Sequence, residues 1–190
     1  MLFHFNHLYR NAATMSNPAP LQFRDFQASD LAAIAQAMGD ARVTQFYGLE
    51  TTHTQPSAIA QEQLDWFVSL AKDGEGWWQA ITHNGAVAGA VGIYDFDEDG
   101  DSADLGFWLL PAHWGQGLMQ QALRQWLPQA FARLALHSIV AYVVPDNRAS
   151  GKLLNAAGFQ YEGLLRECTK RGARYVSLQR YSLLTQELKA

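Results

Sequence analysis

The chain has 190 residues, an apolar fraction of 48% and a formal net charge of −4. These values predict one globular domain with a substantial core and argue against a nucleic-acid partner bound through a general basic surface. The only cysteine, Cys168, excludes an internal disulfide framework and suits a reducing compartment, so we expect a cytoplasmic protein. No apolar run approaches the roughly 18–20 residues of a membrane span, and we expect no membrane association.

The first 19 residues are predicted to form a flexible or loosely packed tail ahead of a domain at 20–190. They lack a basic region before their apolar residues, which argues against a signal peptide. Met15 begins a more polar segment, so translation could start at either Met1 or Met15.

Apolar periodicity and capping residues predict the elements of the first part of the chain. These are a strand at 21–26, a helix at 31–38 with an N-cap at Ser29–Asp30 and a C-cap at Gly39, an irregular segment at 39–54, and a helix at 56–71.

Three strands in close order are expected next, at 77–82, 86–94 and 103–110. An Asn-Gly pair at 84–85 is a strong hairpin signal between the first two. Trp77 and Trp78 should divide between core and surface. The acidic segment 95–101 fits half of a calcium loop, but position 106 lacks the required Glu, so a solvated hairpin is favoured and no metal site is predicted.

The stretch 105–134 reads as a strand, a turn with two glycines and a long amphipathic helix starting at Leu118. Beyond it we predict a buried strand at 139–144, a helix from Asn147 to Ala157 capped by Gly158, and strands at 159–166 and 174–184 around a turn at 170–172. This order predicts a mixed α/β or α+β sheet.

The turn Gly115-Gln116-Gly117 precedes helix N–H groups that have no partner within the helix and lie at the positive end of its dipole. Glycines there would let a phosphate or pyrophosphate approach the backbone. A purely structural turn is the alternative, and the spacing matches neither the P-loop nor the three-glycine dinucleotide fingerprint.

The segments PAHWGQGLMQQAL and VVPDNRASGKLLNAAGFQYEGLLRE resemble the Gcn5-related N-acetyltransferase (GNAT) family, and more narrowly its RimJ/RimL ribosomal-protein branch. In the first motif, Trp114 and Met119 depart from the strict pattern. The second motif is present as Asp146, Asn147, Ser150, Leu153, Gly158, Phe159, Glu162, Gly163 and Arg166. The order of elements from 21 to 184 resembles the family as well.

The resemblance implies a mostly antiparallel seven-stranded sheet with a splayed pair of parallel strands, flanked by about four helices. It implies acetyl-CoA as cofactor, with pantetheine pairing to backbone in the gap. Arg148, Lys152 or Arg124 could meet the remaining phosphate charge. The implied cofactor-binding residues are Leu109, Leu110, Trp114, Gly115, Gln116, Gly117, Leu118, Met119, Gln120, Asn147 and Lys152.

The implied reaction is direct attack of a neutral amine on the thioester, with Asp104, Ser150 and Asn147 as the catalytic set. An α-amine, with a pKa of roughly 8, needs only a modest base. Asp104 would be that base, although it could be only a hairpin-edge carboxylate. Ser150 could donate a proton or only satisfy helix backbone. The position of the tyrosine acid found in many relatives holds Leu154.

By analogy, the acceptor is an N-terminal α-amine of a protein or peptide, entering between the 39–54 segment with the second helix and the 168–174 hairpin. Small-molecule amines and lysine side chains stay open. A non-catalytic acyl-CoA-binding module of the same fold is the rival prediction. The chain is expected to be a monomer or a homodimer.

Overall fold

The computed structural model describes residues 20–48, 51 and 53–188, so the predicted tail and the choice of start codon lie outside it. Its strands are β1 (Gln22–Arg24), β2 (Gly76–His83), β3 (Ala86–Tyr94), β4 (Ser102–Leu109), β5 (Ser138–Val143), β6 (Gln160–Arg171) and β7 (Arg174–Leu184). Its α-helices are α1 (Leu31–Met38), α2 (Ala41–Tyr47), α3 (Pro56–Asp73), α4 (Leu118–Leu134) and α5 (Arg148–Ala157).

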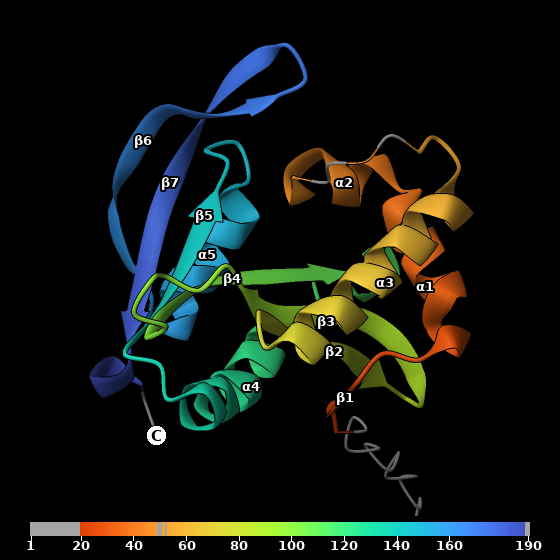
Figure 1. Ribbon diagram of the computed structural model, residues 1–190, viewed down its shortest axis with the longest axis horizontal. Coiled ribbons are helices and arrows are strands. Elements are labelled where there is room, and N and C mark those ends of the chain that lie inside the picture. Colours follow the sequence, from red (N-terminus) through yellow and green to blue (C-terminus); the bar gives the residue numbers. More distant parts are fainter. Residues whose placement is uncertain (1–19, 49–50, 52, 189–190) are drawn as a thin grey trace, which may run out of the picture.

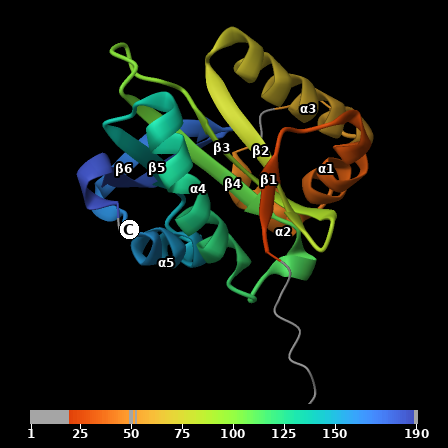
Figure 2. The same ribbon diagram turned by 90° about the horizontal axis from the view of Figure 1, so that it is seen from below.

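The seven strands form one sheet in the order β1-β2-β3-β4-β5-β7-β6. Among the described residues, β4 and β5 are the parallel pair and all other neighbours are antiparallel. Helices α1, α2 and α3 lie over one face, and α4 and α5 over the other (Figures 1 and 2). The predicted seven-stranded α+β fold with a splayed parallel pair is confirmed, with five α-helices among the described residues instead of about four.

Each face of the sheet has its own apolar core. Side chains of α4 and α5 pack with one cluster, which includes Leu105 and Leu109, while α1–α3 pack with a second cluster, which includes Trp78, Trp108 and Leu110. Neighbouring strand residues point to opposite faces, so a sheet covered on both sides buries both.

The prediction that Trp77 and Trp78 divide between core and surface is therefore wrong. Both are buried, with exposed fractions of 8% and 4%, and they belong to the two different cores.

The prediction of an irregular segment at 39–54 is wrong for residues 41–47, which form α2. Asp40 caps this helix by accepting a hydrogen bond from the Arg42 N–H, and Gly48 ends it in the left-handed conformation at φ 72°. Both capping residues can be recognised in the sequence, but a helix of seven residues is too short to show a clear helical spacing of apolar residues.

Two smaller predictions also need correction. Asp30 does not cap α1 with its side chain; it pairs with Arg24 at 2.7 Å and accepts from the Gln27 N–H at 2.8 Å. Strand β6 continues to Arg171, past the predicted end at 166, and its pairing with β7 shifts register twice.

The acidic segment is a loop between β3 and β4, as predicted. Asp97 accepts hydrogen bonds from the backbone N–H groups of Asp101 and Ser102, each at 3.1 Å.

Candidate active site

The site begins where β4 and β5 separate. Their parallel register covers Ser102 with Ser138, Ala103 with Ile139 and Asp104 with Val140, and the described residues beyond these are not paired. A cavity of about 990 Å³ runs along this gap and is lined from both faces of the sheet. The gap therefore connects the α4/α5 side of the sheet to the α2/α3 side.

The backbone edge that faces the gap belongs to Leu109 and Phe107. The Leu110 N–H donates to the Ala88 carbonyl at 2.9 Å. Because paired and unpaired residues alternate along an antiparallel ladder, the backbone groups of Leu109 and Phe107 turn away from β3 and toward the gap.

Leu110, a predicted cofactor contact, cannot offer its backbone. Its N–H is bonded to Ala88, its carbonyl accepts from the His113 N–H at 2.9 Å, and its side chain lies in the α1–α3 core. Phe107, which the sequence analysis did not name, is the second residue, beside Leu109, whose backbone groups face the gap.

The α4/α5 end of the cavity has the form of an anion cradle. Gly115 and Gly117 both have φ 72°, and a Cβ on either would meet no described atom within 4 Å. Gly117 is the N-cap of α4 and, among the described residues, no side chain caps the helix. The first N–H groups of α4 thus face open space at the positive end of the helix dipole.

Most of the predicted cofactor residues line this cavity. Those that do are Leu109, Trp114, Gly115, Gly117, Leu118, Met119, Gln120, Asn147 and Lys152. Gln116 does not, and its side-chain amide donates to the Ala112 carbonyl at 2.8 Å.

Asn147 and Ser150 stand at the start of α5, on the β5 side of the cavity. The Asn147 Oδ1 accepts from the Ser150 N–H at 3.2 Å, so Asn147 is the N-cap of the helix. Both residues line the cavity, whereas Leu154, at the vacant tyrosine position, is fully buried.

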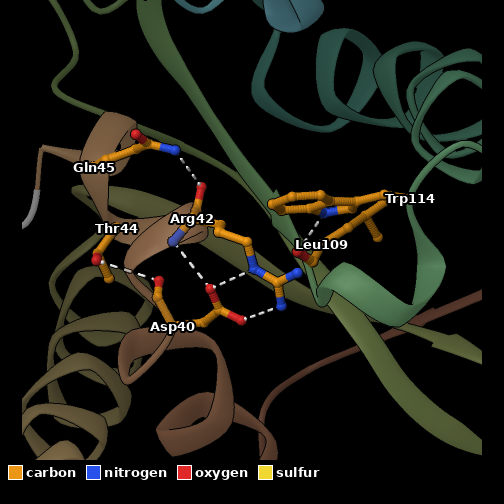
Figure 3. A network of polar contacts seen from close by, with 6 residues as sticks. All are labelled: Asp40, Arg42, Thr44, Gln45, Leu109 and Trp114. Atoms are coloured by element: carbon orange, nitrogen blue, oxygen red, sulfur yellow. Dashed lines mark hydrogen bonds and ion pairs between the residues drawn. The ribbon is translucent and has the colours of Figure 1, made fainter.

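Trp114 connects the glycine turn to the cavity wall and to α2 (Figure 3). Its indole N–H donates to the Leu109 carbonyl at 2.8 Å, one of the groups on the open edge. The Arg42 guanidinium lies 5.8 Å from the ring centroid and is itself held by Asp40 at 2.6 Å. The network joins the two ends of the site through one aromatic ring.

Asp104 lies at the bottom of the gap, at the last paired position of β4, but does not itself line the cavity. Burial, together with the nearby Asp95 carboxylate and against the opposing effect of Arg180, raises the pKa of its carboxyl to about 7. Its cross-strand partner on β3 is Tyr94, which does line the cavity. Burial, with Asp104 close by, raises the pKa of Tyr94 to about 12.

The α2/α3 end of the cavity has aromatic walls that sequence reasoning missed. The walls are formed by Tyr47, Trp66, Trp78, Tyr94 and Trp108. These residues come from α2, α3, β2, β3 and β4. Their positions follow from sheet register and helix docking, which no local sequence motif encodes.

The tip of the β6–β7 hairpin lies against the end of α2, because a Cβ on Gly48 would stand 2.9 Å from the Arg171 guanidinium. No described residue of 168–174 lines the cavity, so the entrance expected between these two elements stays a prediction.

The sequence from 21 to 160 matches the family model of the acetyltransferase (GNAT) domain. The chain is 30% identical over 169 residues to the uncharacterized N-acetyltransferase p20 of Bacillus licheniformis, covering 88% of this chain and 94% of that protein. It is 26% identical over 123 residues to the putative ribosomal N-acetyltransferase YdaF of Bacillus subtilis, covering 65% and 67% of the two chains.

Solved structures share the fold at lower identity. Mycobacterium smegmatis RimJ in complex with CoA-disulfide has a TM-score of 0.80 at 22% identity, over 90% of this chain and 84% of that one. A spermidine N-acetyltransferase from Vibrio cholerae, in complex with CoA and spermine, has a TM-score of 0.75 at 21% identity, over 88% and 97%.

A sheet opened at one parallel pair, with a glycine-built anion cradle on one side, defines an acyltransferase of the coenzyme A-dependent class. The chain belongs to the Gcn5-related N-acetyltransferase family; it is an N-acetyltransferase, and its cofactor is acetyl-CoA. The open cradle and the backbone edge at Leu109 and Phe107, which no described strand pairs with, fit that cofactor.

Among the described residues, no helix is both long and apolar enough to cross a membrane.

Proposed function

We propose that the chain acetylates the N-terminal α-amine of a protein or peptide, as a cytoplasmic monomer or homodimer. The observation that carries the proposal is the cavity through the sheet, with an anion cradle at one end and aromatic walls at the other. A cofactor bound from the α4/α5 side and an acceptor bound from the α2/α3 side would meet in the gap between β4 and β5.

The cofactor end would bind by backbone and charge. The α4 N-terminus after Gly117 would hold the pyrophosphate, and Lys152 would meet a further phosphate. Phe107 and Leu109 would pair with the pantetheine amides, as an added strand pairs with a sheet edge. For this pairing, the Leu109 carbonyl must be released by the Trp114 indole.

Acetyl-CoA supplies the acetyl thioester. The amine nitrogen of the acceptor forms the new C–N bond, the C–S bond breaks, and the sulfur leaves as the thiolate. Asp104 takes the proton that the amine loses; with a pKa of about 7 its carboxyl is near the value that serves a base best at neutral pH. Since Asp104 does not line the cavity, Tyr94 would pass that proton, accepting one from the amine as it donates its own to Asp104.

Ser150 would protonate or hydrogen-bond the leaving thiolate, because it lines the cavity at the start of α5. Leu154 cannot serve as the acid, since it is an apolar side chain buried in the core.

The acceptor class is supported by the chemistry of the amine. An α-amine with a pKa of roughly 8 is about a tenth neutral at pH 7, whereas a lysine amine is neutral to only a few parts in ten thousand. A single carboxyl with a pKa of about 7 is matched to the first of these. RimJ and a ribosomal acetyltransferase among the relatives are consistent with it.

The test is thiol release from acetyl-CoA with three acceptors: a free N-terminal peptide, the same peptide N-terminally blocked but carrying a lysine, and a polyamine. We expect the free N-terminus to be acetylated fastest, and Tyr94→Phe and Asp104→Asn each to slow it at least tenfold. Asp99→Asn, an exposed carboxylate of the β3–β4 loop, is the matched control. Binding of CoA without turnover of any amine would favour the non-catalytic module instead.

A further inference from the structure

Two buried indole N–H groups stand at the acceptor end of the cavity with no hydrogen-bond partner among the described residues. They belong to Trp78 and Trp108, each 4% exposed, and both residues line the cavity. Leaving a buried donor unpaired costs about 1–3 kcal/mol, and such groups are rare in native proteins. By contrast, the indole N–H groups of Trp114 and Trp126 are paired, at 2.8 and 3.0 Å.

The Trp78 ring cannot turn to find a partner elsewhere. It lies flat across Gly92 of β3 and Gly106 of β4, where an added Cβ would stand 2.2 and 2.5 Å from ring atoms. Phe67 stacks on it, with ring centroids 4.7 Å apart. Gly106 is two residues beyond the last β4–β5 pair, so the indole of a β2 residue ends beside the gap. The two glycines thus hold the ring at the point where acetyl transfer would occur.

Trp108 lies beside Tyr47 of α2. The Tyr47 hydroxyl donates to the Gln63 Oε1 at 3.0 Å. Burial raises the pKa of Tyr47, and the nearby Trp108 N–H partly offsets that rise without forming a hydrogen bond of ordinary geometry. The Trp108 donor is therefore also held at the cavity wall without a proper acceptor.

The charges at this end do not suit a polycation. Among its described lining residues, the acceptor end offers one carboxylate, Glu62, and one guanidinium, Arg42, which Asp40 already neutralises. A polyamine carries several ammonium groups, each a donor without an acceptor atom. Such a molecule would leave both indole N–H groups unpaired and would meet too few carboxylates.

We propose that the acceptor carries a carbonyl oxygen next to its reacting amine, as the first peptide bond of a protein N-terminus does, and that the indole N–H groups of Trp78 and Trp108 bind it. This inference rests on the proposed N-terminal acetylation and specifies how the acceptor is recognised. The two nitrogen atoms are covered in the free protein, so the acceptor reaches them by moving the partly buried Tyr47 and Trp66 aside.

The test compares two peptides that differ in one atom: a free N-terminal peptide, and the same peptide with its first carbonyl oxygen replaced by sulfur, a weaker hydrogen-bond acceptor. For the wild-type protein we expect kcat/KM to be about tenfold higher for the oxygen peptide, the effect of one good hydrogen bond. In Trp78→Phe and in Trp108→Phe, each of which keeps a ring and loses one N–H, we expect this ratio to fall in part. In the double variant we expect it to fall close to one.

Trp77→Phe is the matched control, because Trp77 is the next residue on β2 and packs on the opposite face of the sheet. Its oxygen-to-sulfur ratio should equal that of the wild type. A wild-type ratio near one, an unchanged ratio in Trp78→Phe, or a polyamine acetylated faster than the oxygen peptide would each overturn the inference. If no amine were acetylated at all, the result would contradict the proposed function and not this inference alone.

Discussion

Replacing Asp104 with Asn tests whether a partly buried carboxyl at the bottom of the gap has the raised pKa that its surroundings imply. Its pKa of about 7 against an ordinary value of 3.8 corresponds to about 4 kcal/mol at 1.36 kcal/mol per pKa unit. Solvent reaching the side chain screens part of this effect, and we take about 2 kcal/mol as the working magnitude.

The direction follows from proton binding. Between pH 3.8 and about 7 the folded protein holds the Asp104 proton while the unfolded chain releases it. Stability from this group is therefore complete below pH 3.8 and declines as the pH rises toward 7. Asn cannot ionise, so Asp104→Asn should lack this decline.

Urea unfolding of both proteins at pH 5 and pH 8 measures the effect. We expect the free energy of unfolding of the wild type, relative to Asp104→Asn, to be about 1–2 kcal/mol lower at pH 8 than at pH 5. In kinetics, the wild-type kcat/KM should rise through pH 7, and the variant should keep only the rise that comes from the amine. The same stability difference at both pH values, together with an unchanged pH–rate profile, would refute the assignment of Asp104.

Three further substitutions separate the parts of the cleft. Gly117→Ala should weaken CoA binding at least tenfold in calorimetry, because its Cβ enters the anion cradle. Gly85→Ala is the control: it also lies at positive φ in an open turn, so it should cost similar stability, about 1 kcal/mol, and leave CoA binding unchanged. Trp114→Phe should tighten CoA binding about threefold to tenfold, since the Leu109 carbonyl no longer has to be released by the indole; weaker binding would mean that the indole serves the cofactor. Gly106→Ala should destabilise the protein by about 1–3 kcal/mol and raise the KM of the peptide more than that of acetyl-CoA, because its Cβ collides with the Trp78 ring. Equal rises in the two KM values would contradict the division of the cleft.

Elements with strong local signals could be predicted from the sequence. The long helix at 118–134 has the predicted bounds, and the Asn84-Gly85 pair marked the β2–β3 hairpin. The errors fall where local signals are weak. Helix α2 is one short element between caps, and most residues in the outer part of β6 are exposed, so no apolar alternation marks its length.

The two ends of the site also differ in how far they could be predicted from the sequence. The cofactor end is built from contiguous motifs, the glycine turn and the start of α5, so its residues could be named from the family resemblance that these motifs carry. The acceptor end is built by register: Trp78 of β2 reaches the gap only because Gly92 and Gly106 stand in line with it on the next two strands. A single sequence gives no register, and so neither the aromatic walls nor the unpaired indoles could be predicted.

The register also explains why the cleft lies where it does. Parallel pairing of β4 and β5 stops at Asp104, and the next position on the same face of β4, Gly106, has no side chain to close the opening. The gap is therefore open from both faces of the sheet. The Trp78 ring, which covers Gly106, forms part of its wall and carries no nucleophile. Under the proposed function the amine of the acceptor would attack the acetyl group directly, with no acyl-enzyme step, and the nearby hydroxyl of Ser150 would serve the leaving sulfur and not attack the thioester.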